Sequence, residues 1–295
     1  MELTIQNLTK EFGTLRAVDS VSVTMTGGVY GLLGVNGAGK TTLMRMLTTL
    51  IRPTSGEILW DGQDIFTLDG EYRKNLGYLP QDFGYYPDFS VQDYLMYIAS
   101  IKGLRPAVAR ERVTRLLNQV GLSKARNKKM KTLSGGMKRR AGIAQAMLND
   151  PKILILDEPT AGLDPSERIR FRNLISELSG DRIVLLSTHI VSDIEYIANE
   201  ILLMKDGAIT LSGTAEEIVA SMPEKVWTFT VPKAKIEGFL RAYKVANVKT
   251  TPGGGELRVL SAKQPTADAI AVEPNLEDAF LHYFGESAGE TDASV

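Results

Sequence analysis

A glycine-rich loop that joins a strand pattern to a helix pattern constrains the fold of this chain more than any other feature. The apolar run GVYGLLG (28–34) leads into GVNGAGKT (34–41), a full match to GxxxxGK[ST], and the helical pattern TTLMRMLTTLI (41–51) follows. In such a loop, backbone N–H groups surround phosphate oxygens and the start of the helix favours negative charge. The sequence therefore predicts an α/β fold that binds a nucleoside triphosphate.

Most positions of this loop have an expected role. Gly37 and Gly39 let the backbone curl around the phosphates, Lys40 reaches the outer phosphates, and the Thr41 hydroxyl ligates Mg²⁺. We therefore count Lys40 as catalytic and Thr41 as a metal ligand. A glycine turn beside a surface lysine is the alternative. The residues expected to contact the nucleotide are Gly34, Asn36, Gly37, Ala38, Gly39, Lys40, Thr41 and Thr42.

A second apolar run, KILILDE (152–158), ends in two acidic residues. The run is typical of a buried parallel strand, and ligands of open α/β sheets bind at the carboxyl ends of such strands. We expect Asp157 to hold Mg²⁺ and Glu158 to polarise the attacking water, because phosphoryl transfer needs positioning and charge neutralisation. Two solvated carboxylates that open a loop are the alternative.

Two more polar residues follow strand patterns and are candidate catalytic residues. His189 ends the third run, RIVLLSTH (182–189), where an imidazole N–H could contact a γ-phosphate, although histidines at strand ends often have a structural role. Gln81 follows the short apolar run 76–79. Its amide could contact Mg²⁺ or water, so we also count it as a metal ligand; taken alone, it is a polar turn residue.

Two further nucleotide-site candidates have structural alternatives. Asp164, in AGLDPSERIRF, is placed to cap a helix that begins at Pro165, with Glu167 three residues on. The alternative to capping, a role of Asp164 at the nucleotide site, requires a second subunit. Phe12, in KEFGTLRAV, could stack on a base or belong to the core.

The stretch LSGGMKRRAGIAQ (133–145) places two glycines at a predicted helix start that no strand pattern precedes. A helix start attracts anions, yet the predicted phosphate already has its own loop far upstream. We count Ser134, Gly135 and Gly136 as candidates for contact with a second anion. Ser134 is also placed to act as a simple N-cap.

Composition narrows the class of protein. The 34 Lys and Arg nearly balance the 35 Asp and Glu, so we expect no nucleic-acid partner, and we interpret the basic run at 124–140 as a solvated face. The chain has no cysteine, and its start, MELTIQNLTKEF, lacks the apolar core of a signal peptide, which favours the cytoplasm. The charge-free stretch Ser20–Gly39 is too polar to span a membrane.

The patterns also predict how the chain is divided. Helical patterns at 90–101 and 109–121 indicate a helical subdomain over about 82–150. After SMPEK (221–225) the pattern changes to strands around a triple glycine and a final helix, PNLEDAFLHYF. The expected parts are therefore a first domain at 1–221, a small α+β domain at 222–284 and a disordered tail at 285–295.

Taken together, GVNGAGKT, Gln81, LSGGM, ILILDEP, AGLDP and His189, in this order, resemble the nucleotide-binding subunit of ATP-binding cassette (ABC) transporters. The likeness covers about residues 1–221. It implies a P-loop NTPase core, with a mixed or parallel sheet and flanking helices, together with an antiparallel β part and the helical subdomain. It also implies an ATPase that uses ATP and Mg²⁺.

The resemblance implies a role for Gly135 and Gly136. In this family two subunits pack head to tail, and the LSGG helix of one faces the γ-phosphate of the ATP that the other holds. Asp164 would then lie across the seam between the two sites. The family usually has glutamine where Met137 stands, and we expect hydrolysis to survive this departure because the backbone donors remain.

By the same resemblance, a separate polytopic membrane subunit is a partner, and residues 81–148 would dock against its cytoplasmic helix. The chain would then sit on the inner face of the cell membrane. The ending PNLEDAFLHYF resembles subunits of two-component exporters of drugs, antibiotic peptides, polymers or lipids. A soluble ABC ATPase of ribosomes or DNA is the alternative, as is a regulator that does not hydrolyse ATP; the latter would need a degraded Glu158 or His189.

Overall fold

The computed structural model describes residues 1–285, which form two compact units, Met1–Thr210 and the residues from Leu211 onward. The domain boundary expected at residue 221 falls within the second unit. Beyond Gly285, the tail expected to be disordered lies outside the described residues.

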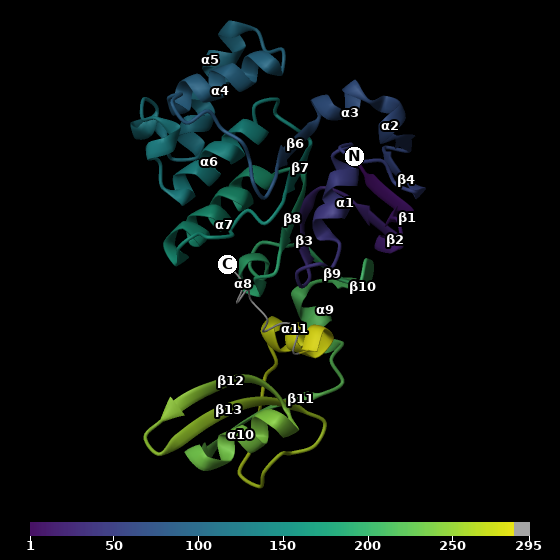
Figure 1. Cartoon of the computed structure of the whole chain (residues 1–295), viewed down its shortest axis with the longest axis vertical. Helices are drawn as coiled ribbons and strands as arrows, with labels where there is room; N and C mark the ends of the chain where they lie inside the picture. The colour runs from purple at the N-terminus through teal and green to yellow at the C-terminus, as the bar shows by residue number, and fades with distance from the viewer. Residues whose placement is uncertain (286–295) are drawn as a thin grey trace. The chain divides into compact units, whose positions relative to one another are not determined.

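The first unit is built on a six-stranded sheet in the order β10-β9-β3-β8-β7-β6. β3 pairs in parallel with β8 and β9, and β7 pairs in parallel with β6 and β8. Because these strands are parallel, the residues that follow β3, β6, β7 and β8 lie at one edge of the sheet (Figure 1). The strands are β3 (Gly28–Leu33), β6 (Leu76–Leu79), β7 (Ile153–Leu156), β8 (Ile183–Thr188), β9 (Glu200–Lys205) and β10 (Ala208–Gly213).

A second, antiparallel sheet of this unit has the order β2-β1-β4-β5. It shares one hydrophobic core with the central sheet and with helix α1 (Lys40–Leu47), to which Leu8, Leu32 and Met44 each contribute fully buried side chains. The sheet thereby anchors the helix that begins at the glycine loop. Its strands are β1 (Leu3–Phe12), β2 (Leu15–Met25), β4 (Ser55–Trp60) and β5 (Gln63–Asp64).

Helices occupy the segments between the central strands. Short helices α2 (Ile65–Leu68) and α3 (Gly70–Lys74) precede β6, α7 (Pro165–Ser179) joins β7 to β8, and α8 (Val191–Ile194) follows β8. Strand–helix–strand connections of this kind keep both faces of a parallel sheet covered, which explains the uniformly buried strands β7 and β8.

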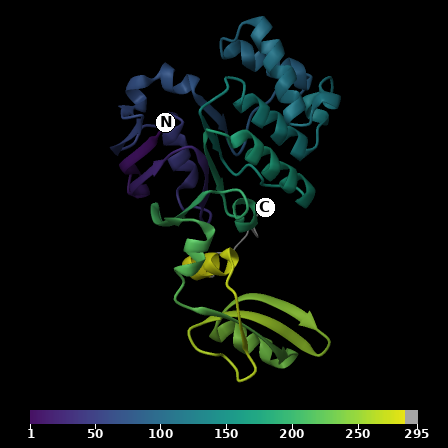
Figure 2. The ribbon, with the colours of Figure 1, turned by 180° about the vertical axis from the view of Figure 1, so that it is seen from behind.

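The helical subdomain lies between β6 and β7. Ser90 caps its first helix by accepting a hydrogen bond from the Asp93 amide at 3.1 Å. Figures 1 and 2 show α4, α5 and α6 gathered beside the central sheet. Its elements are α4 (Val91–Ile101), α5 (Pro106–Gln119), the 3₁₀ turns Ser123–Ala125 and Met130–Thr132, and α6 (Gly135–Ala146).

The second unit contains an antiparallel sheet in the order β12-β13-β11-β14. Helix α10 packs on one face of this sheet, where Phe229, Leu257 and Val259 form the core with Phe239. A hairpin joins β12 and β13, as expected, but Pro252 and Gly253 form its turn, while Gly254 and Gly255 are paired residues of β13. Its elements are α9 (Ala215–Ala220), β11 (Lys225–Pro232), α10 (Lys233–Ala242), β12 (Lys244–Thr251), β13 (Gly254–Ser261), β14 (Ile270–Val272) and α11 (Leu276–Phe284).

The expected fold class is confirmed: a parallel sheet with flanking helices, an antiparallel β part, a helical subdomain and a small α+β part. Within residues 1–285, none of the helices combines the length and the apolar character that crossing a bilayer requires.

Candidate functional site

The glycine loop ends where α1 begins. Gly39 is the N-cap residue of α1, its φ of 103° lies in the left-handed region, and no side chain caps the helix. A Cβ at Gly39 would lie 2.3 Å from the Ala17 carbonyl oxygen, so only glycine fits there. The loop thus leaves the start of α1 open to an anion, as the sequence predicts.

Lys40 is buried at the centre of this loop. Its Nζ donates to the carbonyl oxygens of Gly34 at 2.7 Å and Val35 at 3.1 Å, and lies 3.7 Å from Glu158 Oε1. Burial lowers the pKa of Lys40, and the carboxylates of Glu158 and Asp157 oppose that shift. The loop therefore holds the ammonium group beside the predicted phosphate site.

Asp157 follows β7 and is 1% exposed. Its Oδ1 accepts hydrogen bonds from the hydroxyls of Thr41 at 3.3 Å and Ser187 at 2.7 Å, whereas its buried Oδ2 has no hydrogen-bond partner. A carboxylate with an unsatisfied oxygen beside a hydroxyl suits Mg²⁺, which binds through few protein ligands together with substrate phosphates and water. Residues 1–285 contain no cluster of three or more acidic, histidine or cysteine ligands.

Glu158 is buried and adopts a left-handed backbone conformation, with φ 44°. Its amide donates to Ser187 Oγ at 2.9 Å. One carboxylate oxygen faces Lys40, and the other lies 3.0 Å from His189 Nδ1. Non-glycine residues rarely adopt this conformation without a compensating environment. The backbone of Glu158 is therefore strained, and in this conformation its carboxylate lies between two basic side chains.

His189 lies immediately after β8, at the edge that also carries Asp157 and Glu158. The Glu158 carboxylate raises the pKa of His189 above its ordinary value, and burial opposes this effect. The structure thus brings together Lys40, Glu158 and His189, three of the four predicted catalytic residues.

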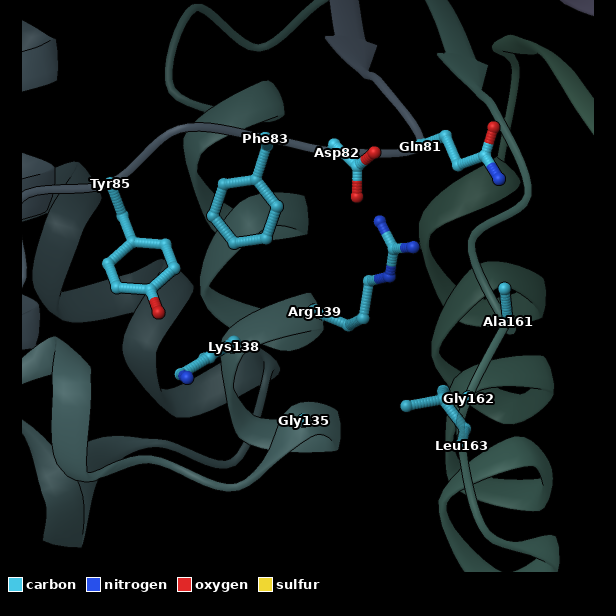
Figure 3. Close-up of a pocket in the computed structure, with 10 residues that line it drawn as sticks. All are labelled: Gln81, Asp82, Phe83, Tyr85, Gly135, Lys138, Arg139, Ala161, Gly162 and Leu163. Atoms are coloured by element: carbon cyan, nitrogen blue, oxygen red, sulfur yellow. The ribbon is translucent and has the colours of Figure 1, made fainter. Parts of the chain in front are cut away.

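The fourth, Gln81, is exposed and follows β6. It lines a cavity of about 210 Å³ between the segment after β6, the start of α6 and the segment after Glu158. Its amide points away from Phe83 and Tyr85 (Figure 3). Gln81 therefore lies at the predicted sheet edge, and its contact with Mg²⁺ stays a prediction.

The LSGG turn lies at the surface. Ser134 and Gly135 are exposed, and Ser134 Oγ accepts a hydrogen bond from the Met137 amide at 3.3 Å, which makes it the N-cap of α6. Gly136 is buried, and a Cβ there would lie 2.6 Å from Glu167 Oε2. The capping interpretation of Ser134 is therefore confirmed, while its exposed hydroxyl stays available to a partner.

Asp164 is also a cap. Its carboxylate accepts from the Glu167 amide at 2.9 Å and the Ser166 hydroxyl at 2.8 Å, at the start of α7. These two donors lower the pKa of Asp164. The structural alternative for Asp164 is thus confirmed, and its contact with a second subunit stays a prediction.

Phe12 ends β1 and is 49% exposed, with Lys10 Nζ 5.1 Å from the centre of its ring. The core alternative is therefore wrong for Phe12. An exposed ring of this kind is free to stack on a base, as the sequence suggests.

Sequence reasoning missed two residues. Ser187, within the buried strand β8, contacts both Asp157 and Glu158; a hydroxyl two positions before His189 was the available signal. The solvated basic face that the sequence predicts over 124–140 is wrong for Arg139 and Arg140. Both are partly buried; Arg139 bonds two carbonyls, and Arg140 Nε lies 3.3 Å from Glu167 Oε2.

Comparison with known proteins finds a matching family and similar sequences. A family model described as "ABC transporter" matches residues 18–161. The uncharacterized ABC transporter ATP-binding protein YxlF of Bacillus subtilis is 38% identical over 239 residues, which cover 81% of this chain and 79% of YxlF. The Nod factor export ATP-binding protein I of Cupriavidus metallidurans is 38% identical over 221 residues, which cover 74% of this chain and 73% of the relative.

Solved structures share the fold. CbiO1 of Clostridium perfringens, described as part of the ABC transporter complex CbiONQ, has a TM-score of 0.67 and 29% identity, covering 74% of this chain and 90% of its own. A dimeric structure of MJ0796, a bacterial ABC transporter cassette, has a TM-score of 0.65 and 25% identity, and the match covers 72% of this chain and 98% of the MJ0796 chain. This chain accordingly belongs to the ABC transporter family, as an ATP-binding subunit with ATPase activity.

Proposed function

We propose that this ATPase works as a dimer that holds ATP between its two copies. The LSGG turn of one copy, Ser134 to Gly136, would close over the ATP bound to the glycine loop of the other. Two observations support this arrangement: Ser134 and Gly135 are exposed, and the first turn of α6 presents backbone donors near them. The structure of MJ0796, a bacterial ABC transporter cassette, is described as dimeric, which supports the pairing of two such subunits.

Each residue at the sheet edge then has a role. Lys40 binds the outer phosphates, and Phe12 stacks on the base. Thr41 and Asp157, with Gln81, would hold Mg²⁺, which supplies charge neutralisation at the phosphates. Glu158 orients and polarises the attacking water, and His189 donates to the γ-phosphate.

The observation that carries this proposal is the placement of Glu158. Its carboxylate is buried between Lys40 and His189, and its neighbour Asp157 has an unsatisfied oxygen. Such a group is ready to accept a proton or a hydrogen bond from water beside a bound phosphate. ATP stabilises the closed dimer, and cleavage removes the γ-phosphate that both copies contact, so hydrolysis resets the dimer to its open state.

The dimer would energise a separate membrane subunit from the cytoplasmic face. The helical subdomain carries an aromatic cluster, Tyr86, Phe89 and Tyr97, whose rings lie 5.0–5.7 Å apart and in which both tyrosines are partly exposed. Exposed aromatic groups are common anchors at interfaces, whereas Tyr94 beside them is buried and serves the core. The Nod factor relative favours export as the direction of transport.

Glu158→Gln tests the function directly, because it keeps the shape of the side chain and removes its basic oxygen. We expect the variant to bind ATP, to lose turnover and to elute as a dimer from a sizing column when ATP and Mg²⁺ are present. Glu177→Gln, at an exposed position of α7, is the matched control and should elute as the wild type does. A Glu158→Gln protein whose elution does not respond to ATP contradicts the proposal.

The partner is tested by isolating the native protein from its own cells. A co-purifying polytopic membrane protein supports the transport role. Co-purifying ribosomes or DNA would contradict it and support a soluble ABC ATPase.

A further inference from the structure

Arg139 joins the helical subdomain to two segments at the carboxyl edge of the central sheet. It lies in the first turns of α6, and its guanidinium group points toward the segment of Gln81 and Asp82 (Figure 3). One terminal nitrogen donates to the Pro80 carbonyl at 3.3 Å, and the other donates to the Glu158 carbonyl at 3.3 Å. These carbonyls follow β6 and β7, which are neighbouring strands.

The chemistry of arginine suits this bridge. A guanidinium group presents several donors in a rigid plane and stays charged, so it can serve two acceptors on different segments at once. Partial burial lowers the pKa of Arg139, and the carboxylates of Asp82, Asp157 and Glu158 oppose that shift. Arg139 therefore remains a cation in a partly dry site, where its hydrogen bonds are stronger than at an open surface.

The second of these bonds acts on a strained residue. Glu158 has a φ of 44°, and its amide is fixed by Ser187 Oγ at 2.9 Å. Its carbonyl accepts hydrogen bonds from Arg139 at 3.3 Å and from the Ala161 amide at 3.2 Å. The backbone of Glu158 is thus held on both sides, by a central strand and by the helical subdomain, in a conformation that non-glycine residues otherwise avoid.

We infer that Arg139 is a positioning residue for ATP hydrolysis: its bond to the Glu158 carbonyl fixes the direction of the Glu158 carboxylate. The inference rests on the proposed role of Glu158 in polarising water. Because Arg139 belongs to α6, the Glu158 carboxylate is correctly aimed only while α6 keeps its place against β6 and β7. Arg139 therefore makes turnover depend on the position of the helix that begins at the LSGG turn.

The test compares steady-state ATPase kinetics of the full-length Arg139→Met and Arg139→Lys variants. We expect Arg139→Met to lower kcat at least about tenfold, the effect of about 1.4 kcal/mol on the barrier, and to leave KM for ATP within about twofold. Arg139→Lys should fall between this variant and the wild type, because an ammonium group keeps the charge but lacks the planar fork. Arg115→Met, at an exposed position of α5, is the matched control and should keep the wild-type kcat.

The outcomes separate this inference from the proposed function. If Glu158→Gln retains turnover, the role of Glu158 is wrong. If Glu158→Gln is inactive while Arg139→Met keeps kcat within twofold of the wild type, only the positioning role is wrong. The positioning role is also wrong if Arg139→Met loses ATP binding and its thermal unfolding transition together with kcat, because that pattern indicates a merely structural role. Should Arg139→Met fail to fold, the kcat and KM of Arg139→Lys decide by the same criteria.

Discussion

His189 and Glu158 form a close pair at the carboxyl edge of the central sheet, with Nδ1 of the imidazole 3.0 Å from Oε2 of the carboxylate. The other carboxylate oxygen faces Lys40. The two basic groups therefore flank the carboxylate that we propose as the water-polarising group. An incoming γ-phosphate would compete with Glu158 for both of them.

This pair predicts a pH-dependent contribution to stability in the nucleotide-free protein. The folded state raises the pKa of His189, so the contribution is fully present below the ordinary histidine pKa of about 6.5. It is lost as the pH rises through the higher pKa of the folded state. The free energy of unfolding of the wild type minus that of His189→Ala should therefore be larger at about pH 6 than at about pH 9.

Urea unfolding at the two pH values checks this prediction. The same pair of measurements in a Glu158→Gln background is the control, because the amide cannot hold a proton on the imidazole. We expect the pH dependence to shrink there. An equal difference at both pH values in the wild-type background would contradict the assignment.

Ser187→Ala should destabilise the first unit. The Ser187 hydroxyl donates to Asp157 and accepts from the Glu158 amide, and both partners are buried. Leaving a buried polar group unsatisfied costs about 1–3 kcal/mol. We expect a loss of that size in the free energy of unfolding, measured with Trp60 as the reporter in a Trp227→Phe background. Ser176→Ala, at an exposed position of α7, should stay within about 0.5 kcal/mol of the wild type.

The carboxyl edge of the central sheet could be predicted from the sequence because strand patterns and parallel pairing suffice to define it. KILILDE and RIVLLSTH each end in a polar residue and GVYGLLG leads into the glycine loop, and parallel strands bring such ends together. Neither the strand order nor the residue distances were needed to group Lys40, Glu158 and His189.

The supports of this edge could not be predicted in the same way. The Arg139 bond to Glu158 joins two segments, and the distance between them depends on how α6 packs against β6 and β7. A local sequence pattern does not predict that packing. The positive φ of Glu158 is equally hidden, since glutamate has no preference for it and only the surrounding bonds sustain it. In the sequence, Ser187 is one more residue of a β-rich run. Its contacts with Asp157 and Glu158 become apparent only once the register of β7 and β8 is known.

The two glycines of the LSGG turn should respond differently to alanine. A Cβ at Gly136 would displace Glu167, which pairs with Arg140, so Gly136→Ala should cost about 1–3 kcal/mol of stability. A Cβ at Gly135 meets nothing within 4 Å, and alanine favours the helix. Gly135→Ala should therefore leave the free energy of unfolding unchanged or slightly higher.

Gly135→Ala should nevertheless weaken ATP-dependent dimerisation in the Glu158→Gln background, because the added methyl group would enter the space proposed for the partner's phosphate. Size-exclusion chromatography across a range of ATP concentrations measures this effect. A Gly135→Ala protein that dimerises at the same ATP concentration as its parent would show that the turn does not approach the nucleotide.

In the second unit, Arg258 holds helix α11 to the sheet. Its Nε lies 3.0 Å from Asp278 Oδ1 and its terminal nitrogen lies 2.6 Å from Oδ2, and Asp278 is 1% exposed. Removing Arg258 takes away the counter-charge of Asp278, although the Asn275 amide still donates to this carboxylate at 2.9 Å. Losing one partner of a buried ion pair costs about 3–5 kcal/mol. Arg258→Met should therefore destabilise this unit by that amount.

Trp227 lies in β11, so a Trp60→Phe background makes its fluorescence report on the second unit alone. Arg241→Met is the matched control: Arg241 pairs with Glu237 on the exposed surface of α10, where an ion pair contributes at most about 1 kcal/mol. If both variants shift the urea midpoint equally, Asp278 must find another partner when Arg258 is absent. A large shift for Arg258→Met alone means that this single ion pair secures α11, and with it the packing of the second unit.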